Sequence, residues 1–295
     1  MLSILIPVYN FDVRELVRVL CEQCEAAAIG FEILLFDDGS SDNFKNIHRE
    51  FYKRKNLVYK ELEKNMGRAA IRNLMAESAQ FEYLLFLDCD GGIIDNNFIY
   101  NYLKLIKPNR LLYGGRCYAA NPPQNSDYFF HWFYGSRRES QPPQMRQKQP
   151  YASFMTNNFL MDKKTFLTIK FNEQLRQYGH EDTLFGLELK KKGIEILHFD
   201  NPVEHLGLEI TSVFIQKTRL AVENLHYLFW KKNFRQTRLL SAYKKLKYNW
   251  LRKIAAKIFL VFEKKMVRNL ASEKPSLLVF DFYKLGYLCT LTGRN

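Results

Sequence analysis

The sequence predicts an α/β fold built on a mostly parallel β-sheet flanked by helices. Apolar runs of strand length occur at residues 3–8, 31–36 and 84–87. Helix-length amphipathic segments separate them, and this alternation is typical of βαβ units. Two of these runs end abruptly in a pair of acidic residues. Because the carboxyl ends of parallel strands lie at one edge of a sheet, where such folds bind ligands, we expect both acidic ends at one site.

The first elements follow from local patterns. After the strand at residues 3–8, apolar residues on one face predict a helix over residues 12–28, which Gly30 ends. The second strand covers residues 31–36. A short helix and a strand near residues 57–59 are expected next.

The strand at residues 84–90 organises the rest of the chain. It is apolar on both faces, as expected for a central strand covered on both sides, until it ends in Asp88 and Asp90. Two carboxylates at spacing i, i+2 suit Mg²⁺ or Mn²⁺, which prefer oxygen ligands. The alternative is that the strand simply ends in a polar turn.

Composition indicates a folded protein. The chain has 295 residues, 47% of them hydrophobic and 15% aromatic, which is enough for a sizeable core. Of its five cysteines, Cys21 and Cys24 form a C-x-x-C pair inside a helical pattern, so we expect reduced structural thiols and a cytoplasmic protein. No basic leader precedes the first strand, and no apolar run approaches the ~20 residues of a membrane-spanning helix.

Charge divides the chain unevenly. The formal net charge is +13. Residues 215–295 hold 18 of the 44 basic and 4 of the 31 acidic residues, a net of +14, so residues 1–214 are close to neutral. This asymmetry predicts an anionic surface as the partner of the C-terminal region.

Residues 235–268 are predicted to form a basic amphipathic helix. Apolar residues recur at steps of three or four from Leu239 to Phe262, and no acidic residue occurs between Glu223 and Glu263. This composition is typical of a helix lying on an anionic membrane surface. The alternative is an appendage packed on the rest of the protein with solvated lysines. No nucleic-acid-binding motif accompanies the charge, so no nucleic acid partner is expected.

Four segments carry a family resemblance in the first ninety residues. They are residues 3–10, 37–42, 65–73 and 87–90. In this order they resemble the nucleotide-sugar half of a family-2 glycosyltransferase with the GT-A fold, a Rossmann-like sheet. The resemblance implies a catalytic domain over residues 1–214, with a nucleotide-sugar half at 1–118 and an acceptor half at 119–214. Residues 215–295 then form a basic helical C-terminal region.

The resemblance implies a nucleotide site. Its residues are Pro7, Tyr9, Asp37, Asp38, Asn65, Gly67, Arg68, Arg72, Asp88 and Cys89. Asp38, or else Asp37, is expected to accept the N–H of uracil. Arg68 and Arg72 are expected to reach the base or the diphosphate, and Asp88 the ribose. Taken singly, the acid pair also fits a helix-capping turn and the arginines a solvated i, i+4 pair.

The acceptor half begins with a segment that the sequence predicts to be a long irregular loop, residues 119–149. Aromatic residues at 128–134 could stack on an acceptor sugar or form a small core under the loop. Regular structure is expected to resume at residues 153–161, followed by a helix near 163–169 and a strand over 194–198.

The catalytic and remaining metal residues are also inferred from the resemblance. A Gly-x-Glu-Asp stretch before a helix resembles the acceptor site of these enzymes, so Asp182 is the expected general base and Glu181 the residue that orients the acceptor. Acids in a first helical turn also simply favour the helix dipole. His205, in preference to His198, resembles the family's third metal ligand, which joins Asp90 in holding Mn²⁺ or Mg²⁺.

The expected activity is therefore transfer of a sugar from a nucleotide diphosphate sugar, a UDP-sugar on this resemblance, with inversion at the anomeric carbon. The expected acceptor is a hydroxyl of a glycan or glycolipid in cell-surface polysaccharide synthesis, at the inner face of a membrane. A polyprenyl phosphate acceptor and a non-catalytic membrane-associated protein are the alternatives.

Overall fold

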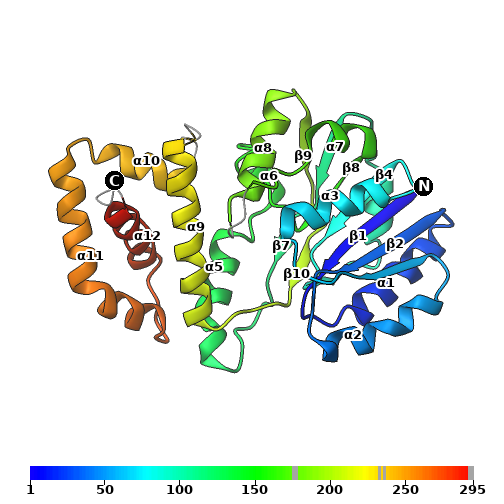
Figure 1. Ribbon diagram of the computed structural model, residues 1–295, viewed down its shortest axis with the longest axis horizontal. Coiled ribbons are helices and arrows are strands. Elements are labelled where there is room, and N and C mark those ends of the chain that lie inside the picture. The colour runs from blue at the N-terminus through cyan, green and yellow to red at the C-terminus, as the bar shows by residue number, and fades with distance from the viewer. Residues whose placement is uncertain (175–178, 232–233, 235–236, 292–295) are drawn as a thin grey trace. The chain divides into compact units, whose positions relative to one another are not determined.

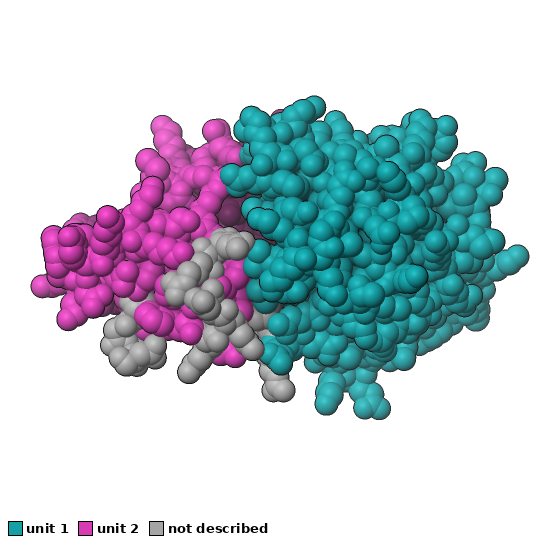
Figure 2. Space-filling view, turned by 90° about the horizontal axis from the view of Figure 1, so that it is seen from above, with its two compact units in different colours: residues 1–119, 139–176, 181–207 teal, residues 120–138, 177–180, 208–295 magenta. Residues whose placement is uncertain are grey.

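The computed structural model describes residues 1–174, 179–231, 234 and 237–291. It divides into two compact units, coloured separately in Figure 2. The first comprises residues 1–119, 139–176 and 181–207, and the second comprises residues 120–138, 177–180 and 208–295. Residues 120–138 thus group with the C-terminal helices.

A seven-stranded sheet forms the centre of the first unit (Figure 1). Its strands in spatial order are β3 (Leu57–Glu61), β2 (Phe31–Asp37), β1 (Leu2–Val8), β4 (Tyr83–Leu87), β8 (Asn158–Asp162), β6 (Arg110–Tyr113) and β9 (Glu195–His198). Strand β8 runs antiparallel to its neighbours β4 and β6, and the other pairs are parallel. The predicted α/β class with a mostly parallel sheet is confirmed.

Helices cover both faces of this sheet because its strands are apolar on both faces. In β1, Ile4 and Ile6 point to one core and Leu5 to the other, and all three are fully buried. Each such side chain contributes about 1.5–3 kcal/mol through burial. Helices α1 (Arg14–Ala26) and α4 (Phe98–Leu103) pack on the first face. Helices α3 (Arg68–Ser78), α7 (Lys163–Ile169) and α8 (Glu181–Lys191) pack on the second.

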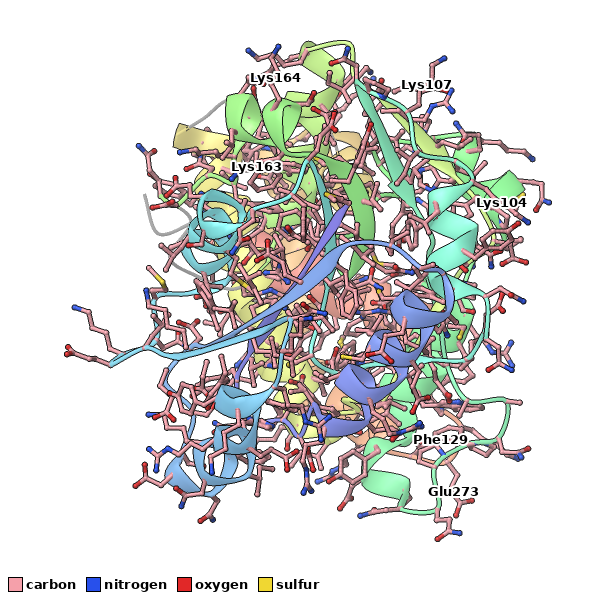
Figure 3. The ribbon with its side chains drawn as sticks, turned by 90° about the vertical axis from the view of Figure 1, so that its right-hand side faces the viewer. Lys104, Lys107, Phe129, Lys163, Lys164 and Glu273 are labelled. Atoms are coloured by element: carbon pink, nitrogen blue, oxygen red, sulfur yellow. The ribbon has the colours of Figure 1, made fainter. Side chains whose placement is uncertain are left out.

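The first unit also contains three short helices, and a lysine at the start of α7 binds the end of α3. The short helices are α2 (Asp42–His48), the 3₁₀ helix η1 (Arg49–Lys53) and α6 (Pro143–Gln147). Lys163, labelled in Figure 3, starts α7 and donates from Nζ to the carbonyl oxygens of Glu77 and Ala79, at 3.2 and 2.5 Å. It therefore satisfies carbonyl groups at the C-terminal end of α3, the helix that carries the site arginines.

A second, three-stranded sheet lies at the end of β4. Its strands in order are β5 (Gly91–Ile93), β10 (Val203–His205) and β7 (Arg116–Cys117). The antiparallel register pairs His205 with Gly91, the residue after Asp90. This small sheet therefore brings a late segment of the chain to the acidic end of β4.

The second unit is helical in the part that the structure describes. Its elements are the 3₁₀ helix η2 (Ser126–Tyr128), α5 (Phe129–Arg138), α9 (Thr211–Lys231), α10 (Arg238–Lys245), α11 (Asn249–Leu270) and α12 (Leu277–Leu291). The prediction of an irregular loop over residues 119–149 was wrong, because the aromatic segment forms α5 and residues 143–147 form α6. Phe130 is 1% exposed and packs on Phe214 and Phe280, so these aromatics build a core of their own.

The predicted continuous basic helix is in fact two helices. The chain leaves helical geometry at Leu246, between α10 and α11, and Arg252 Nε donates to the carbonyl of Leu246 at 2.9 Å. Leu240 and Tyr243 in α10 are buried, whereas Trp250 at the start of α11 is 58% exposed. Leu240 and Tyr243 are therefore in a core, whereas Trp250, Ile254, Ile258 and Phe262 on the predicted apolar side of α11 are exposed. No helix among the described residues is long and apolar enough to cross a membrane.

Candidate active site

The loop before α3 is held by the acidic end of β2. Asp38 is 6% exposed, and its two carboxylate oxygens accept backbone N–H bonds from Met66 at 2.7 Å and Gly67 at 3.2 Å. Gly67 precedes α3 with φ 87°, a left-handed conformation that favours glycine. Burial raises the pKa of Asp38, and the two backbone hydrogen bonds partly oppose that rise. The loop and Asp38 together fix the direction in which α3, and hence Arg68, leaves the sheet.

Three arginines converge on Asp88, the residue after β4. Arg72, which is 4% exposed, pairs with Oδ1, and Arg68 and Arg116 each lie 3.4 Å from Oδ2. Arg116 also pairs with Glu139 at 3.3 Å. Three guanidinium groups around one carboxylate leave donors directed at the same space, which suits a further anion.

Asp90 and His205 form the second part of the site. His205 Nδ1 lies 3.4 Å from Asp90 Oδ2, as the pairing of β10 with β5 requires. Burial alone would raise the pKa of Asp90, but His205, with Arg116 and Arg68, more than offsets it and holds the pKa below its usual value. Asp90 Oδ1 is buried and accepts no hydrogen bond from any residue that the structure describes.

This donor set fits a divalent cation that is completed by the substrate. No group of three or more His, Cys, Asp or Glu side chains suited to a metal occurs among the described residues. An unpartnered carboxylate oxygen beside an imidazole is, however, a site that Mg²⁺ or Mn²⁺ could complete with phosphate oxygens, because these ions are often held by few protein ligands. Asp90 and His205 are the residues that would hold it.

The acidic start of α8 lies near the same arginines. Asp182 Oδ1 accepts a hydrogen bond from Thr156 Oγ1 at 2.7 Å. Burial raises the pKa of the neighbouring Glu181, and the charge of Arg68 opposes part of this rise. Arg68 therefore acts electrostatically on Glu181 as well as on Asp90 and Asp88.

The remaining residues of the predicted nucleotide site lie at or beside the same strand ends. Tyr9 is 53% exposed, and its backbone N–H donates to the thiol of Cys89, whose pKa is raised to about 12 by burial. Pro7 is half-buried and Asn65 exposed. Asp37 is fully buried, with Oδ1 accepting from the Ser40 N–H at 2.7 Å. Of the two acids that end β2, Asp38 is thus the less buried.

Sequence reasoning missed three residues of the site. Arg116 and Glu139 form an ion pair, and neither lies in a segment with a recognisable sequence motif. Thr156 precedes β8, the strand that pairs with β4. His198, the alternative metal ligand, instead places Nε2 2.9 Å from the carbonyl of Pro150. Burial lowers its pKa to about 4, so it is neutral at physiological pH.

A mostly parallel sheet with carboxylates at its strand ends and an arginine-bearing helix beside them defines a glycosyltransferase of the GT-A fold. The family model "Glycosyl transferase family 2" matches residues 3–170. This is more than half of the chain, and the protein belongs to that family.

Characterised relatives include polysaccharide synthases. Chondroitin synthase of Escherichia coli is 31% identical over 223 residues, which cover 65% of this chain and 32% of the relative. Poly(ribitol-phosphate) β-N-acetylglucosaminyltransferase TarS of Staphylococcus aureus is 32% identical over 94 residues, 31% of this chain and 16% of the relative. The chain spans about a third or less of the length of these relatives.

Solved structures share the fold over nearly the whole chain. S. aureus TarS 1–349 in complex with UDP-GlcNAc aligns with a TM-score of 0.51 and 15% identity, covering 99% of this chain and 92% of that one. The mannosyltransferase PcManGT from Pyrobaculum calidifontis, in complex with GDP-Man and Mn²⁺, aligns with a TM-score of 0.55 and 13% identity, covering 100% and 86%.

Proposed function

We propose that the protein is an inverting glycosyltransferase that moves a sugar from a UDP-sugar to a hydroxyl of a glycan or glycolipid in cell-surface polysaccharide synthesis. The observation that carries the proposal is the convergence of Arg68, Arg72 and Arg116 beside the Asp90–His205 pair. The uracil base is favoured by the resemblance of the loops around Asp38 and by the UDP complexes of TarS.

The arginines receive the donor's diphosphate. Asp88 accepts a hydrogen bond from each of the three guanidinium groups. A diphosphate carries more charge than one carboxylate, so it draws Arg68 and Arg116 away and frees Asp88 to accept hydrogen bonds from the ribose. Asp90 and His205 would hold a divalent cation, which would supply positive charge where negative charge develops on the departing diphosphate.

Asp182 is the general base. Thr156 fixes one of its oxygens, and the other takes the proton of the acceptor hydroxyl as that oxygen bonds to the anomeric carbon. The bond between the anomeric carbon and the diphosphate oxygen breaks in the same step, so an α-linked donor gives a β-linked product. Glu181, the neighbour of Asp182 at the start of α8, orients the acceptor by hydrogen bonding.

Three measurements test this function. Calorimetric titration of UDP with Mn²⁺ should show metal-dependent binding that Asp90→Ala abolishes without loss of fold, because a carboxylate is removed at the strand end and no apolar core is disturbed. Unchanged affinity in the variant would remove Asp90 from the metal site. A panel of UDP-sugars with Mn²⁺ should then show donor hydrolysis or transfer; a chain that does neither is a binding protein. Assaying sugar against polyprenyl phosphate acceptors separates the two enzymatic alternatives.

We also propose that residues 235–268 hold the enzyme on the anionic inner face of a membrane. Trp250 is exposed on α11, and the lysines around it supply charge worth about 1 kcal/mol each near such a surface. Sedimentation with anionic and neutral liposomes should show binding to anionic lipid that weakens with salt, because the Debye length is only ~8 Å at physiological salt. Trp250→Glu should weaken the salt-resistant part more than Lys247→Glu; the reverse order contradicts insertion.

A further inference from the structure

The second unit contains a groove of about 710 Å³ between α9, α10, α11 and α12. Four cationic side chains line it, Arg219, Arg252, Lys253 and Lys257, against one acid, Glu263. Aromatic and aliphatic side chains form the rest of its walls: Trp230, Tyr243, Phe259, Leu260 and Tyr287. The groove thus combines an excess of positive charge with apolar surface.

Two of the cations are fixed in place by the aromatic walls. The Arg219 guanidinium lies 4.7 Å from the Tyr287 ring centre and pairs with Glu263. The Arg252 guanidinium lies 4.3 Å from the Tyr243 ring centre. Stacking of this kind holds a guanidinium in one orientation while leaving N–H donors in its plane available.

The other two cations, Lys253 and Lys257, are available to bind an anion. Lys253 and Lys257 are exposed, and neither forms an ion pair with any residue that the structure describes. Since Glu263 is already paired with Arg219, the groove offers a preformed excess charge of about three for an anion, with two flexible ammonium groups at its rim.

The groove borders an exposed apolar surface. Lys257 also lines a smaller pocket of about 220 Å³ on the outer side of α11, with Ile254, Ile258, Val261 and Phe262. All four are exposed, between 41% and 65%. A cationic groove and an unburied apolar surface therefore meet at one lysine, and the ligand that complements both is an anion attached to an apolar tail.

We propose that this groove binds the phosphate-bearing head group of a lipid, with the acyl chains directed over the apolar surface of α11. The assignment rests on the proposed membrane association and deepens it: contact with the membrane is not only diffuse attraction but includes one stoichiometric phospholipid site. The phosphate accepts hydrogen bonds from Arg252, Lys253 and Lys257. A phosphate without a tail uses only the cations, so it binds more weakly.

Soluble short-chain lipids test the site without a membrane. Calorimetry on the full chain compares dihexanoyl phosphatidic acid, dihexanoyl phosphatidylcholine with the same tails, and inorganic phosphate. We expect saturable one-to-one binding of phosphatidic acid and weaker binding of the other two. Inorganic phosphate binding as tightly as phosphatidic acid would overturn the role of the apolar surface. Equal binding of phosphatidylcholine would overturn the role of the cations.

A matched pair of variants separates the groove from general charge. Lys253→Gln with Lys257→Gln removes two charges from the groove, and Lys264→Gln with Lys265→Gln removes two exposed charges from the same helix outside it. The groove pair should lower phosphatidic acid affinity about tenfold or more, since each lysine contributes on the order of 1 kcal/mol. The control pair should change it less than about twofold. An equal loss of phosphatidic acid affinity in both double variants would show that the attraction is diffuse and would overturn the proposed site.

UDP titration with Mn²⁺ in the same samples keeps the two proposals apart. If UDP binds and phosphatidic acid does not, the groove assignment fails and the donor function stands. If phosphatidic acid binds and UDP does not, the proposed donor function fails and the groove stands.

Discussion

Gly207→Ala should damage the proposed metal site through a single added methyl group. Gly207 follows β10, and a Cβ built there would lie 2.9 Å from Asp90 Cβ and 3.0 Å from Asp90 Cγ, and closer still to Oδ2. Carbon atoms in contact are separated by about 3.5–4.0 Å, so the Asp90 side chain has to move by roughly 0.5–1 Å. This movement is restricted, because Oδ1 of Asp90 is buried and Oδ2 lies 3.4 Å from His205 Nδ1.

The expected effect is confined to donor binding. Turning the Asp90 carboxylate away from a preferred rotamer costs about 0.5–1.5 kcal/mol of stability, which leaves the chain folded. Displacing a group that sets metal geometry typically costs about 10–100-fold in metal affinity or activity. We therefore expect the Mn²⁺-dependent affinity for UDP to fall within that range while the metal-independent affinity stays unchanged.

Calorimetric titration of UDP with and without Mn²⁺ measures the metal-dependent and the metal-independent affinity. Thermal unfolding shows whether the variant is folded. Gly30→Ala is the matched control, because the added Cβ meets only the side chain of Met1. A Gly207→Ala protein that keeps wild-type Mn²⁺ dependence refutes the placement of Asp90 at the metal. A variant that loses metal-independent UDP binding as well refutes the steric argument.

Three further predictions concern the base and a buried histidine. Asp182→Asn should lower transfer about 10²–10⁴-fold in single-turnover assays and leave UDP affinity unchanged; transfer within a few-fold of wild type would place the base elsewhere. Thr156→Val should lower kcat and leave UDP affinity unchanged, since the hydrogen bond that orients the Asp182 carboxylate is lost, and Thr156→Ser should restore kcat. Because burial lowers the pKa of His198 to about 4, only the unfolded chain gains this proton as pH falls below about 6.5, so stability should drop by about 2 kcal/mol between pH 7 and 5. His198→Gln should remove this part of the pH dependence of urea unfolding; an identical pH dependence in both proteins would contradict it.

Much of the first unit could be predicted because its signals are local. Each signal predicts the structure of the residues immediately around it. These signals are the apolar strands, the acidic strand ends at Asp38 and Asp88, and the glycine before Arg68. Because the carboxyl ends of parallel strands lie at one edge of a sheet, these residues are expected at one site even when no long-range contact is known. This is why the α/β class and the family were both predictable.

The rest depends on contacts between distant segments. Nothing around Arg116 indicates that it reaches Asp88, because that pairing depends on a two-residue strand and on Glu139. The aromatic segment of α5 was predicted to be a loop because prolines and glutamines flank it on both sides, and its contacts with Phe280 are with a residue far along the chain. The break at Leu246 lies beside the buried Tyr243, whose burial the sequence pattern alone does not reveal.

The three-stranded sheet has a consequence for how the enzyme is made. Its middle strand, β10, pairs His205 with Gly91, residues that leave the ribosome far apart in time. Closing so long a segment costs entropy, although the cost rises only slowly with length. In a growing chain, β1 to β4 and the arginines of α3 are synthesised before this histidine. The proposed metal pair, Asp90 and His205, is therefore complete only after the segments that would hold the nucleotide.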